Sequence, residues 1–228
     1  MLVGHQPLEQ APRSVSPPTA ILSPTWEIWS MIAIIKYNAG NIQSVQYALQ
    51  RLGINAVVTD DHEEIKNADK VIFPGVGNAN SAMQSLREKN LDKVITQLKQ
   101  PVLGICVGMQ LMCNYSEENN TECLGIVDLE VKKFSSPEIN TFKIPQMGWN
   151  TIRNFKSSLF EGIKENTFVY YVHSYYAGIG SETIATTDYI VSYSAVIQKD
   201  NFYGVQFHTE KSAEVGDRIL LNFLNLNS

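Results

Sequence analysis

The strongest constraint on the fold is an alternation of short β-type runs and amphipathic segments that begins at Met31. In the segment NIQSVQYALQRLG, apolar residues recur on one helical face and Gly53 provides a C-terminal stop. Residues 78–99 also have a helical pattern, whereas DDHEEIKNAD reads as a polar loop. The β-type runs around these segments are IAIIKY, INAVV, KVIFPG and PVLGIC. Strands that alternate with helices predict an α/β fold with an open, mostly parallel sheet flanked by helices.

The second half of the chain is richer in β-branched and aromatic residues, which predicts extra antiparallel strands there. The expected strands are LGIVDLEVKKF, FVYYVHSYYA, YIVSYSAVIQ and the end of KDNFYGVQFH. The terminal EVGDRILLNFLNL predicts an amphipathic helix that faces inward through Ile219, Leu220 and Phe223. No repeat or internal linker is visible, so residues 31–228 are expected to form one domain. Residues 1–30 contain five of the nine prolines and no secretory signal, and we expect a poorly ordered extension.

Composition excludes several classes of function. The net charge is −5 and no Lys/Arg cluster is present, so nucleic acid is not an expected partner. No apolar run approaches the roughly 20 residues that span a bilayer, so no membrane segment is expected. Three cysteines without a CxxC spacing predict neither a disulfide framework nor a zinc site, and they fit a reducing cytoplasm. We expect no metal and no cofactor.

A cysteine stands between two glycines at the end of the fourth predicted strand, in the run LGICVGMQL. Gly104-Ile105-Cys106-Val107-Gly108 has the GxSxG spacing of a nucleophile elbow, with sulfur in place of oxygen. A helix that begins just beyond, at about Gly108, would favour the thiolate through its N-terminal amides and dipole. The alternative is a small buried hydrophobe, which is the common fate of a free cysteine. Cys113 and Cys123 are predicted to be inert.

A cysteine nucleophile needs a histidine and a group that orients the imidazole. Of the four histidines, His5 lies in the extension and His62 in a polar loop, which leaves His173 and His208. Glu210 favours His208, because residues i and i+2 of a strand project to the same side. A surface ion pair at a strand end is the competing interpretation of this pair.

The run PGVG follows the third predicted strand, which we expect to adjoin the strand of Cys106. Backbone N–H groups of Gly75, Val76 and Gly77 could bind a developing oxyanion together with the N–H of Val107. A plain glycine turn would look the same in the sequence. The run lacks the GxxxxGK[ST] pattern of a phosphate loop.

Taken together, PGVG, LGICVGMQL and GVQFHTEKS resemble the class I, triad-type glutamine amidotransferases. Within that family, YNAGNIQSV, PGVGNANSAM, IPQMGWN and YVHSYY resemble motifs of the glutaminase subunits of imidazole glycerol phosphate synthases. The resemblance covers about residues 31–228 and implies a flavodoxin-like amidotransferase domain. The chain departs from the family pattern at Lys36, Val107, Gln146 and Thr209, and none of these changes removes a member of the proposed triad.

The resemblance implies an enzyme that hydrolyses L-glutamine through a thioester on Cys106, with His208 and Glu210 as its partners. Ammonia would pass to a separate cyclase subunit with a (β/α)8 barrel, in a heterodimer that serves histidine biosynthesis. Substrate contacts are implied for Gln110, Glu118, Ser174 and Tyr175. A partner interface is implied for Met147, Gly148, Trp149, Asn150 and Lys211.

Three other functions remain open from the residues alone. A paralogous amidotransferase could serve another acceptor, such as a nucleotide sugar or a chorismate- or purine-derived compound. A stand-alone cysteine hydrolase would cleave peptides or esters without a partner. A non-catalytic subunit on the same fold would be expected to lack part of the triad, and Cys106, His208 and Glu210 are all present.

Overall fold

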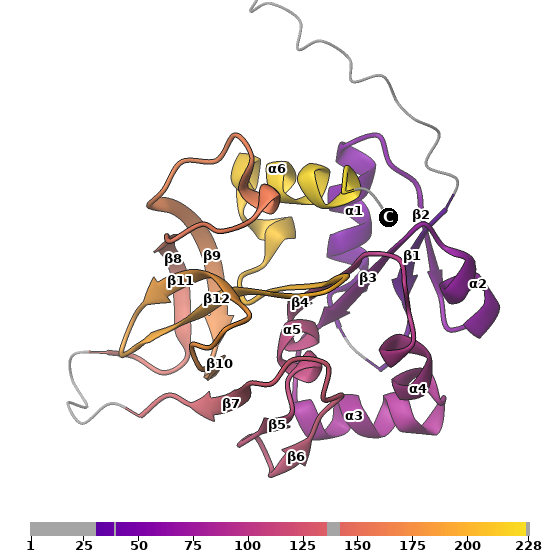
Figure 1. The fold of residues 1–228 in the computed structure, drawn as a ribbon, viewed down its shortest axis with the longest axis horizontal. Coiled ribbons are helices and arrows are strands. Elements are labelled where there is room, and N and C mark those ends of the chain that lie inside the picture. Colours follow the sequence, from indigo (N-terminus) through magenta and orange to yellow (C-terminus); the bar gives the residue numbers. More distant parts are fainter. Residues whose placement is uncertain (1–30, 39, 136–141, 227–228) are drawn as a thin grey trace, which may run out of the picture.

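The computed structural model describes residues 31–38, 40–135 and 142–226, and the expectation about residues 1–30 falls outside them. A seven-stranded sheet runs through the molecule in the order β11-β12-β13-β4-β3-β1-β2 (Figure 1). The pairs from β2 to β13 are parallel, and β12 is antiparallel to both of its neighbours. The strands of this central sheet are β1 (Ile32–Ile35), β2 (Ala56–Thr59), β3 (Lys70–Gly75), β4 (Val102–Cys106), β11 (Thr183–Asp188), β12 (Ser192–Lys199) and β13 (Phe202–Val205). The predicted mostly parallel sheet is confirmed.

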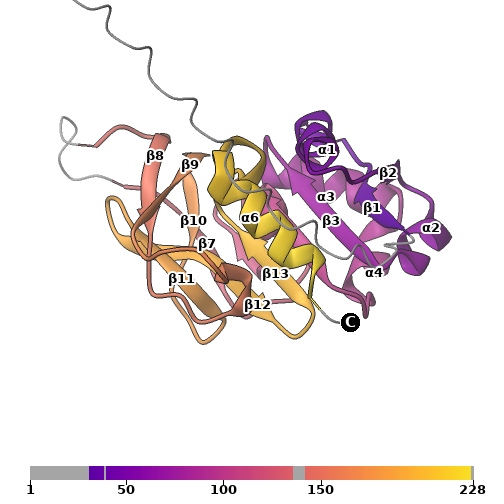
Figure 2. The same ribbon diagram turned by 90° about the horizontal axis from the view of Figure 1, so that it is seen from above.

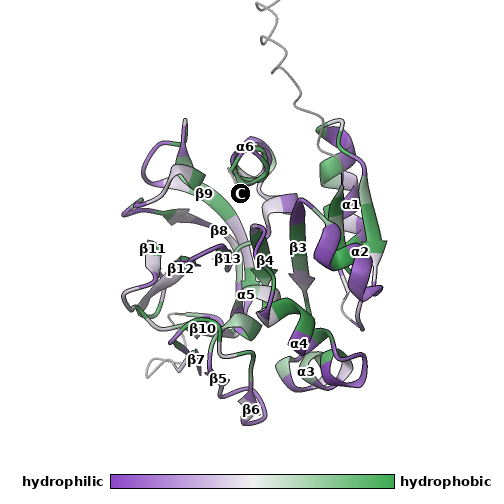
Figure 3. Cartoon of the chain, turned by 45° about the vertical axis from the view of Figure 1, so that its right-hand side comes forward, coloured by the Kyte–Doolittle hydropathy of each residue, from purple (hydrophilic) through white to green (hydrophobic). Residues whose placement is uncertain are grey.

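Helices cover both faces of the parallel part of this sheet. In Figure 1, α1 and α6 lie above it and α3, α4 and α5 below it. Strands β3 and β4 are buried at every position, and Figure 3 shows them as largely hydrophobic. A strand that is covered on both faces has no solvent side, which explains the continuous apolar runs VIFPG and VLGIC. The helices are α1 (Ile42–Arg51), α2 (His62–Asn67), α3 (Ala79–Glu88), α4 (Leu91–Thr96), α5 (Val107–Met112) and α6 (Ala213–Leu224). As predicted, α6 buries Ile219, Leu220 and Phe223.

Two smaller sheets stand beside the central one, on the side of β11 and β12 in Figure 2. One has the order β10-β7-β5-β6, and the other is the antiparallel pair β8-β9, in which Gln146 lies opposite His173. Their strands are β5 (Tyr115–Ser116), β6 (Thr121–Glu122), β7 (Glu130–Lys133), β8 (Gln146–Ile152), β9 (Thr167–His173) and β10 (Tyr175–Ala177). Short 3-10 helices are η1 (Ser158–Phe160) and η2 (Thr209–Lys211).

Two local predictions are wrong, and two strands were missed. The segment predicted as a polar loop contains α2, which begins after Asp61 because that side chain accepts hydrogen bonds from two backbone N–H groups of the first turn. Only Glu130–Lys133 of the predicted strand 124–134 is extended as a strand. Residues 124–127 instead donate their N–H groups to carbonyls at the end of α5, at Leu111, Met112 and Cys113, which would otherwise lack partners. The strands β8 and β11 were not predicted.

No helix in the described part of the chain is both long and apolar enough to cross a membrane.

Candidate active site

Cys106 ends β4 at a sharp turn into α5. Its backbone has φ 54° and ψ −110°, a conformation that a non-glycine residue rarely adopts. Strained backbone of this kind occurs where the surrounding structure imposes it, often at functional sites. The helix begins at Val107 rather than at the predicted Gly108. Cys106 is 3% exposed and lines a pocket, so its sulfur lies at the wall of that pocket.

The two elbow glycines are needed because neighbouring backbone comes too close for a side chain. A Cβ on Gly108 would lie 1.9 Å from the carbonyl oxygen of Phe73 in β3. A Cβ on Gly104 would lie 2.8 Å from the backbone nitrogen of Met109. Side chains at these two positions would therefore collide with the backbone of β3 and of α5.

His208 and Glu210 form a buried ion pair, in which Nδ1 and Oε1 are 2.7 Å apart. Both side chains are almost fully inaccessible to solvent, which excludes the surface ion pair considered above. The strand geometry that suggested this pairing is wrong. Strand β13 ends at Val205, and the chain turns into η2 directly after His208, so the 3-10 turn brings the carboxylate back to the ring.

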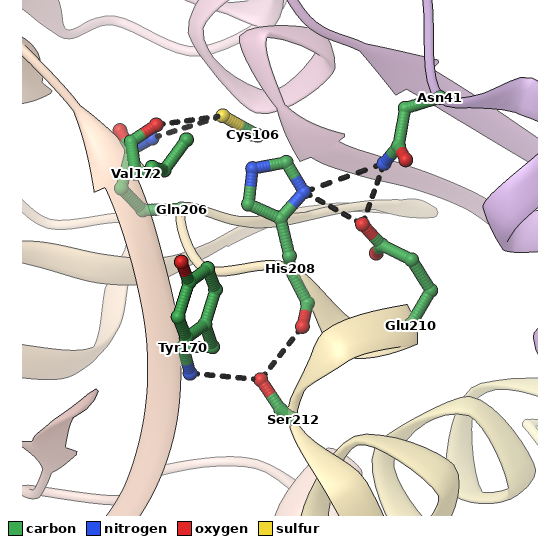
Figure 4. A network of polar contacts seen from close by, with 8 residues as sticks. All are labelled: Asn41, Cys106, Tyr170, Val172, Gln206, His208, Glu210 and Ser212. Carbon is green, nitrogen blue, oxygen red and sulfur yellow. Dashed lines mark hydrogen bonds and ion pairs between the residues drawn. The ribbon is translucent and has the colours of Figure 1, made fainter. Parts of the chain in front are cut away.

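Hydrogen bonds to the neighbouring strand hold the backbone of His208 in place. Its N–H donates to the carbonyl of Tyr170 in β9, and its carbonyl accepts from the hydroxyl of Ser212. The same hydroxyl accepts from the N–H of Tyr170 (Figure 4). In Figure 4 the ring lies between the sulfur of Cys106 and the carboxylate of Glu210. Its Nε2 is buried and has no hydrogen-bond partner among the described residues, so it is available for proton transfer.

Electrostatics at the site favour a charged imidazole. Burial alone would lower the pKa of His208, but the neighbouring Cys106 and Glu210 outweigh it and raise that pKa to about 10. Burial would likewise raise the pKa of Glu210, yet the hydrogen bonds and charge that it receives keep it below its ordinary value. The arrangement is that of a base that can hold a proton and release it to a leaving group.

Asn41 contacts the same carboxylate, and sequence reasoning missed it. Its Nδ2 donates to Oε1 of Glu210 over 2.5 Å and lies 3.4 Å from Nδ1 of His208. The residue has a left-handed conformation, with φ 75°, which Asn adopts more readily than most residues. The only signal in the sequence was its place in the family-like motif YNAGN.

The Gly-Val-Gly segment lies beside the elbow, as expected. Strand β3 pairs with β4 in parallel, and Gly75 stands opposite Cys106. Val76, Gly77 and Val107 line the same pocket as Cys106, whereas Gly75 packs against α5 and the hydroxyl of Tyr37. The structure therefore brings this segment and the sulfur to one edge of the sheet.

The pocket has a volume of about 240 Å³, smaller than the roughly 300–1,000 Å³ of sites for drug-sized ligands, so it suits a small molecule. All four residues expected to contact substrate line it. Gln110 is buried rather than exposed on the surface of α5. The Oε2 of Glu118 accepts from the N–H of Ala79 at the start of α3. The lining residues are Val76, Gly77, Cys106, Val107, Gln110, Glu118, Pro145, Met147, Val172, His173, Ser174 and Tyr175.

Gln206 is a second residue that sequence reasoning missed. It is fully buried, its Nε2 lies 3.8 Å from the sulfur of Cys106, and its Oε1 accepts from Gln110.

Burial lowers the pKa of the other candidate base, His173, to about 4. The ring nitrogens of His173 contact the carbonyl of Tyr175 and the hydroxyl of Tyr193, and neither partner is a carboxylate.

The remaining cysteines have no comparable setting. Burial raises the pKa of Cys113 well above its ordinary value, and burial is also the main cause that raises the pKa of Cys123 to about 12. No group of three or more potential metal ligands occurs within the described residues.

The residues expected at a partner interface lie on β8 and η2, and all but Met147 lie outside the pocket. Met147 is 66% exposed and Trp149 is 53% exposed, so Trp149 is not a core residue. Gly148 and Asn150 are partly exposed, and Lys211 is exposed. A shallow cavity of about 340 Å³ lies along this strand between Phe142, Met147, Trp149 and Tyr189. Met147 borders both this cavity and the pocket of Cys106.

Comparisons with known proteins agree with this geometry. The chain is 59% identical over 195 residues to the imidazole glycerol phosphate synthase subunit HisH of Bacteroides fragilis, covering 86% of this chain and 99% of the relative. The protein of the same name from Bacteroides thetaiotaomicron is 55% identical, with the same coverage. A glutamine amidotransferase from Thermotoga maritima shares the fold, with a TM-score of 0.56 and 14% identity over 86% of this chain and 82% of that one. The family model of class I glutamine amidotransferases matches residues 33–226. This chain therefore belongs to the class I glutamine amidotransferase family.

Proposed function

We propose that this chain is the glutaminase component of imidazole glycerol phosphate synthase, where it hydrolyses L-glutamine to glutamate and ammonia. The names of its relatives and the family match support this function. The observation that carries the chemistry is the convergence of Cys106 at the end of β4, His208 after β13 and Glu210 in η2, with Cys106 lining a pocket the size of a small metabolite. We further propose that residues 31–228 form the amidotransferase domain.

In the proposed reaction, the thiolate of Cys106 attacks the side-chain amide carbon of glutamine and forms a C–S bond. The carbonyl oxygen becomes an oxyanion, which backbone N–H groups of Val107 and the Gly75–Gly77 segment stabilise. His208 donates its proton to the amide nitrogen, the C–N bond breaks and ammonia leaves. Water, deprotonated by His208, then hydrolyses the thioester, releasing glutamate and restoring the thiolate. Glu210 holds the ring and stabilises the imidazolium.

The four polar residues of the pocket are proposed to bind the substrate. Gln110, Glu118, Ser174 and Tyr175 surround the space next to the sulfur. The carboxylate of Glu118 suits the ammonium group of an amino acid, because opposite charges attract strongly in a partly buried site. Free thiol chemistry of this kind also fits a reducing compartment, and we propose the cytoplasm.

We propose that the exposed face of β8 binds a cyclase subunit with a (β/α)8 barrel, in a heterodimer. Ammonia is largely protonated in neutral water and then no longer nucleophilic, so transfer to a synthase requires a covered route. Met147, Gly148, Trp149, Asn150 and Lys211 are the proposed contacts. Exposed Trp and Met side chains are typical of the centre of protein interfaces.

A glutaminase assay with and without the cyclase and its nucleotide substrate tests the proposal. Wild-type chain should hydrolyse glutamine slowly alone and faster in the complex, whereas Cys106→Ala and Cys106→Ser should abolish glutamine-dependent turnover. The same variants should leave synthesis from free ammonia intact, because the cyclase site is unchanged.

Near-normal glutaminase activity in Cys106→Ala would contradict the assignment of the nucleophile. Equal rates with and without the cyclase would contradict coupling. Hydrolysis of peptides or esters by the chain alone would favour a stand-alone hydrolase, and co-purification with a different synthase would favour another acceptor.

A further inference from the structure

Two buried glutamines link the substrate pocket to the sulfur of Cys106. Gln110, on α5, donates through Nε2 to the carbonyl of Tyr175 and to Oε1 of Gln206, over 2.9 Å in each case. Gln206 follows β13 and directs its own Nε2 at the sulfur over 3.8 Å. Gln110 is 2% exposed and Gln206 is inaccessible to solvent, so water does not compete for these bonds.

The direction of this chain of hydrogen bonds is set at one end by the backbone. The carbonyl of Tyr175 can only accept, so Gln110 must present its NH2 group there rather than its oxygen. The second hydrogen of that NH2 group then points to Gln206, which must accept it through Oε1. Gln206 consequently has only its own NH2 group left to face the sulfur. A flip of Gln110 would place two acceptors opposite each other in a buried site, and a flip of Gln206 would place two donors opposite each other.

We propose that Gln206 is a positioning residue that donates an N–H to the sulfur of Cys106, with Gln110 fixing its orientation, and that this contact favours the thiolate. The inference rests on the proposed role of Cys106 as nucleophile and deepens it. A hydrogen bond to the charged form of a group favours that form, and a thiolate accepts such a bond better than a thiol. Besides the ring of His208, the other polar neighbour of the sulfur is the carbonyl of Val172 at 4.0 Å, which can interact only with the protonated thiol.

This arrangement also limits how Gln110 can bind substrate. Both hydrogens of its amide are used within the protein, and Oε1 is the atom that remains for glutamine. A substrate that hydrogen-bonds to Gln110 and shifts its side chain would also shift Gln206 and so change the contact between Gln206 and the sulfur. Binding at the pocket and ionisation of the nucleophile are then coupled through two side chains.

Other ionisable groups near the sulfur have to be separated from this effect. His208 adjoins the sulfur and is paired with Glu210. The hydroxyl of Tyr37 donates to the carbonyl of Pro74 in β3. The other ionisable residues line the pocket and are His173, Tyr175 and Glu118. Substitutions at Gln206 leave all of these groups in place, so a change in the alkylation rate of Cys106 at neutral pH reports on the amide.

The test is the pH dependence of Cys106 alkylation by iodoacetamide in the full chain, followed by mass analysis of the peptide that contains Cys106. Gln206→Met keeps the volume of the side chain but cannot donate, and we expect alkylation at neutral pH to slow about tenfold. Gln206→Glu keeps an acceptor for Gln110 and places a second oxygen at the sulfur, so alkylation at neutral pH should slow further. The alkylation rate at high pH, where every sulfur is ionised, should match wild type.

Gln198→Met is the matched control. Gln198 also donates through Nε2 to a protein oxygen, the hydroxyl of Tyr203, and it makes no contact with Cys106. Its alkylation profile should equal that of wild type. Thermal unfolding of each variant identifies a misfolded protein, and Gln206→Glu then serves in place of Gln206→Met.

Alkylation profiles of Gln206→Met and Gln206→Glu that superimpose on the wild-type profile would overturn the proposal. Alkylation does not require turnover, so this result is distinguishable from failure of the proposed function. In that second case, Cys106→Ala would retain glutaminase activity whatever the titration of the thiol.

Discussion

Gly108 is the position where the structure leaves least room for a side chain at the elbow. A Cβ there would lie 1.9 Å from the carbonyl oxygen of Phe73, whereas ordinary van der Waals contact begins near 3.4 Å. Strand β3 and helix α5 would have to separate by about 1.5 Å to admit a methyl group. The obstructing group is a backbone carbonyl in a buried core, so no side-chain rotation can relieve the collision.

We expect Gly108→Ala to destabilise the protein by about 3 kcal/mol, at the upper end of the cost of overpacking. For a domain of this size that corresponds to a fall in Tm of roughly 6–12 °C. Activity should fall further than stability explains, because α5 carries Val107 and Gln110 next to the sulfur. Scanning calorimetry and a glutaminase assay of the complex, performed below the Tm of the variant, measure the two effects separately.

Gly178→Ala is the control for adding the same methyl group. The nearest atom to a Cβ at Gly178 is the carbonyl oxygen of Glu130 at 3.9 Å, and the residue lies away from the elbow. Its Tm and activity should stay close to wild type. If Gly108→Ala behaved like Gly178→Ala in both assays, the explanation of the elbow glycines would be refuted.

Three further predictions concern the site and the proposed interface. Glu210→Gln should lower the pKa of His208 from about 10 by about 1–3 units, measured by NMR titration of the imidazole, and an unchanged titration would contradict the pairing. The pKa of His208 lies above its ordinary value of 6.5, so the charged ring stabilises folded wild type fully below about pH 6.5. This stabilisation is lost as pH rises through about 10. The free energy of unfolding of Glu210→Gln should fall less over the same pH range. Asn41→Asp should reduce kcat more than Asn41→Gly, because both tolerate the left-handed backbone but Asp places a second carboxylate beside Glu210; equal kcat values would exclude this contact from catalysis. Trp149→Ala should leave the Tm nearly unchanged and weaken cyclase binding by about 2 kcal/mol, and calorimetric titration with equal affinities would exclude Trp149 from the interface.

Local patterns were sufficient for the parallel half of the fold. The apolar runs that became β1, β3 and β4 and the helical periodicity of α1 and α6 depend only on neighbouring residues and on burial of one or both faces. The same is true of the elbow, since glycine spacing around Cys106 reflects a turn of five residues. Predictions failed where capping at the end of a helix decides the outcome. In α2, the Asp61 side chain accepts hydrogen bonds from the first turn and so allows a helix to begin in a polar segment.

The sequence by itself determined the order of most elements along the chain and the place of Cys106 at the end of a strand. It also singled out the pair of His208 and Glu210, although through a strand geometry that the structure replaces with a 3-10 turn. The tertiary structure decided which side chains complete the site. Asn41 reaches Glu210 across 169 positions, and Gln206 reaches Cys106 across 100. Such contacts leave no local period, because they arise only when the carboxyl ends of β4 and β13 meet at one edge of the sheet and η2 turns back toward α1.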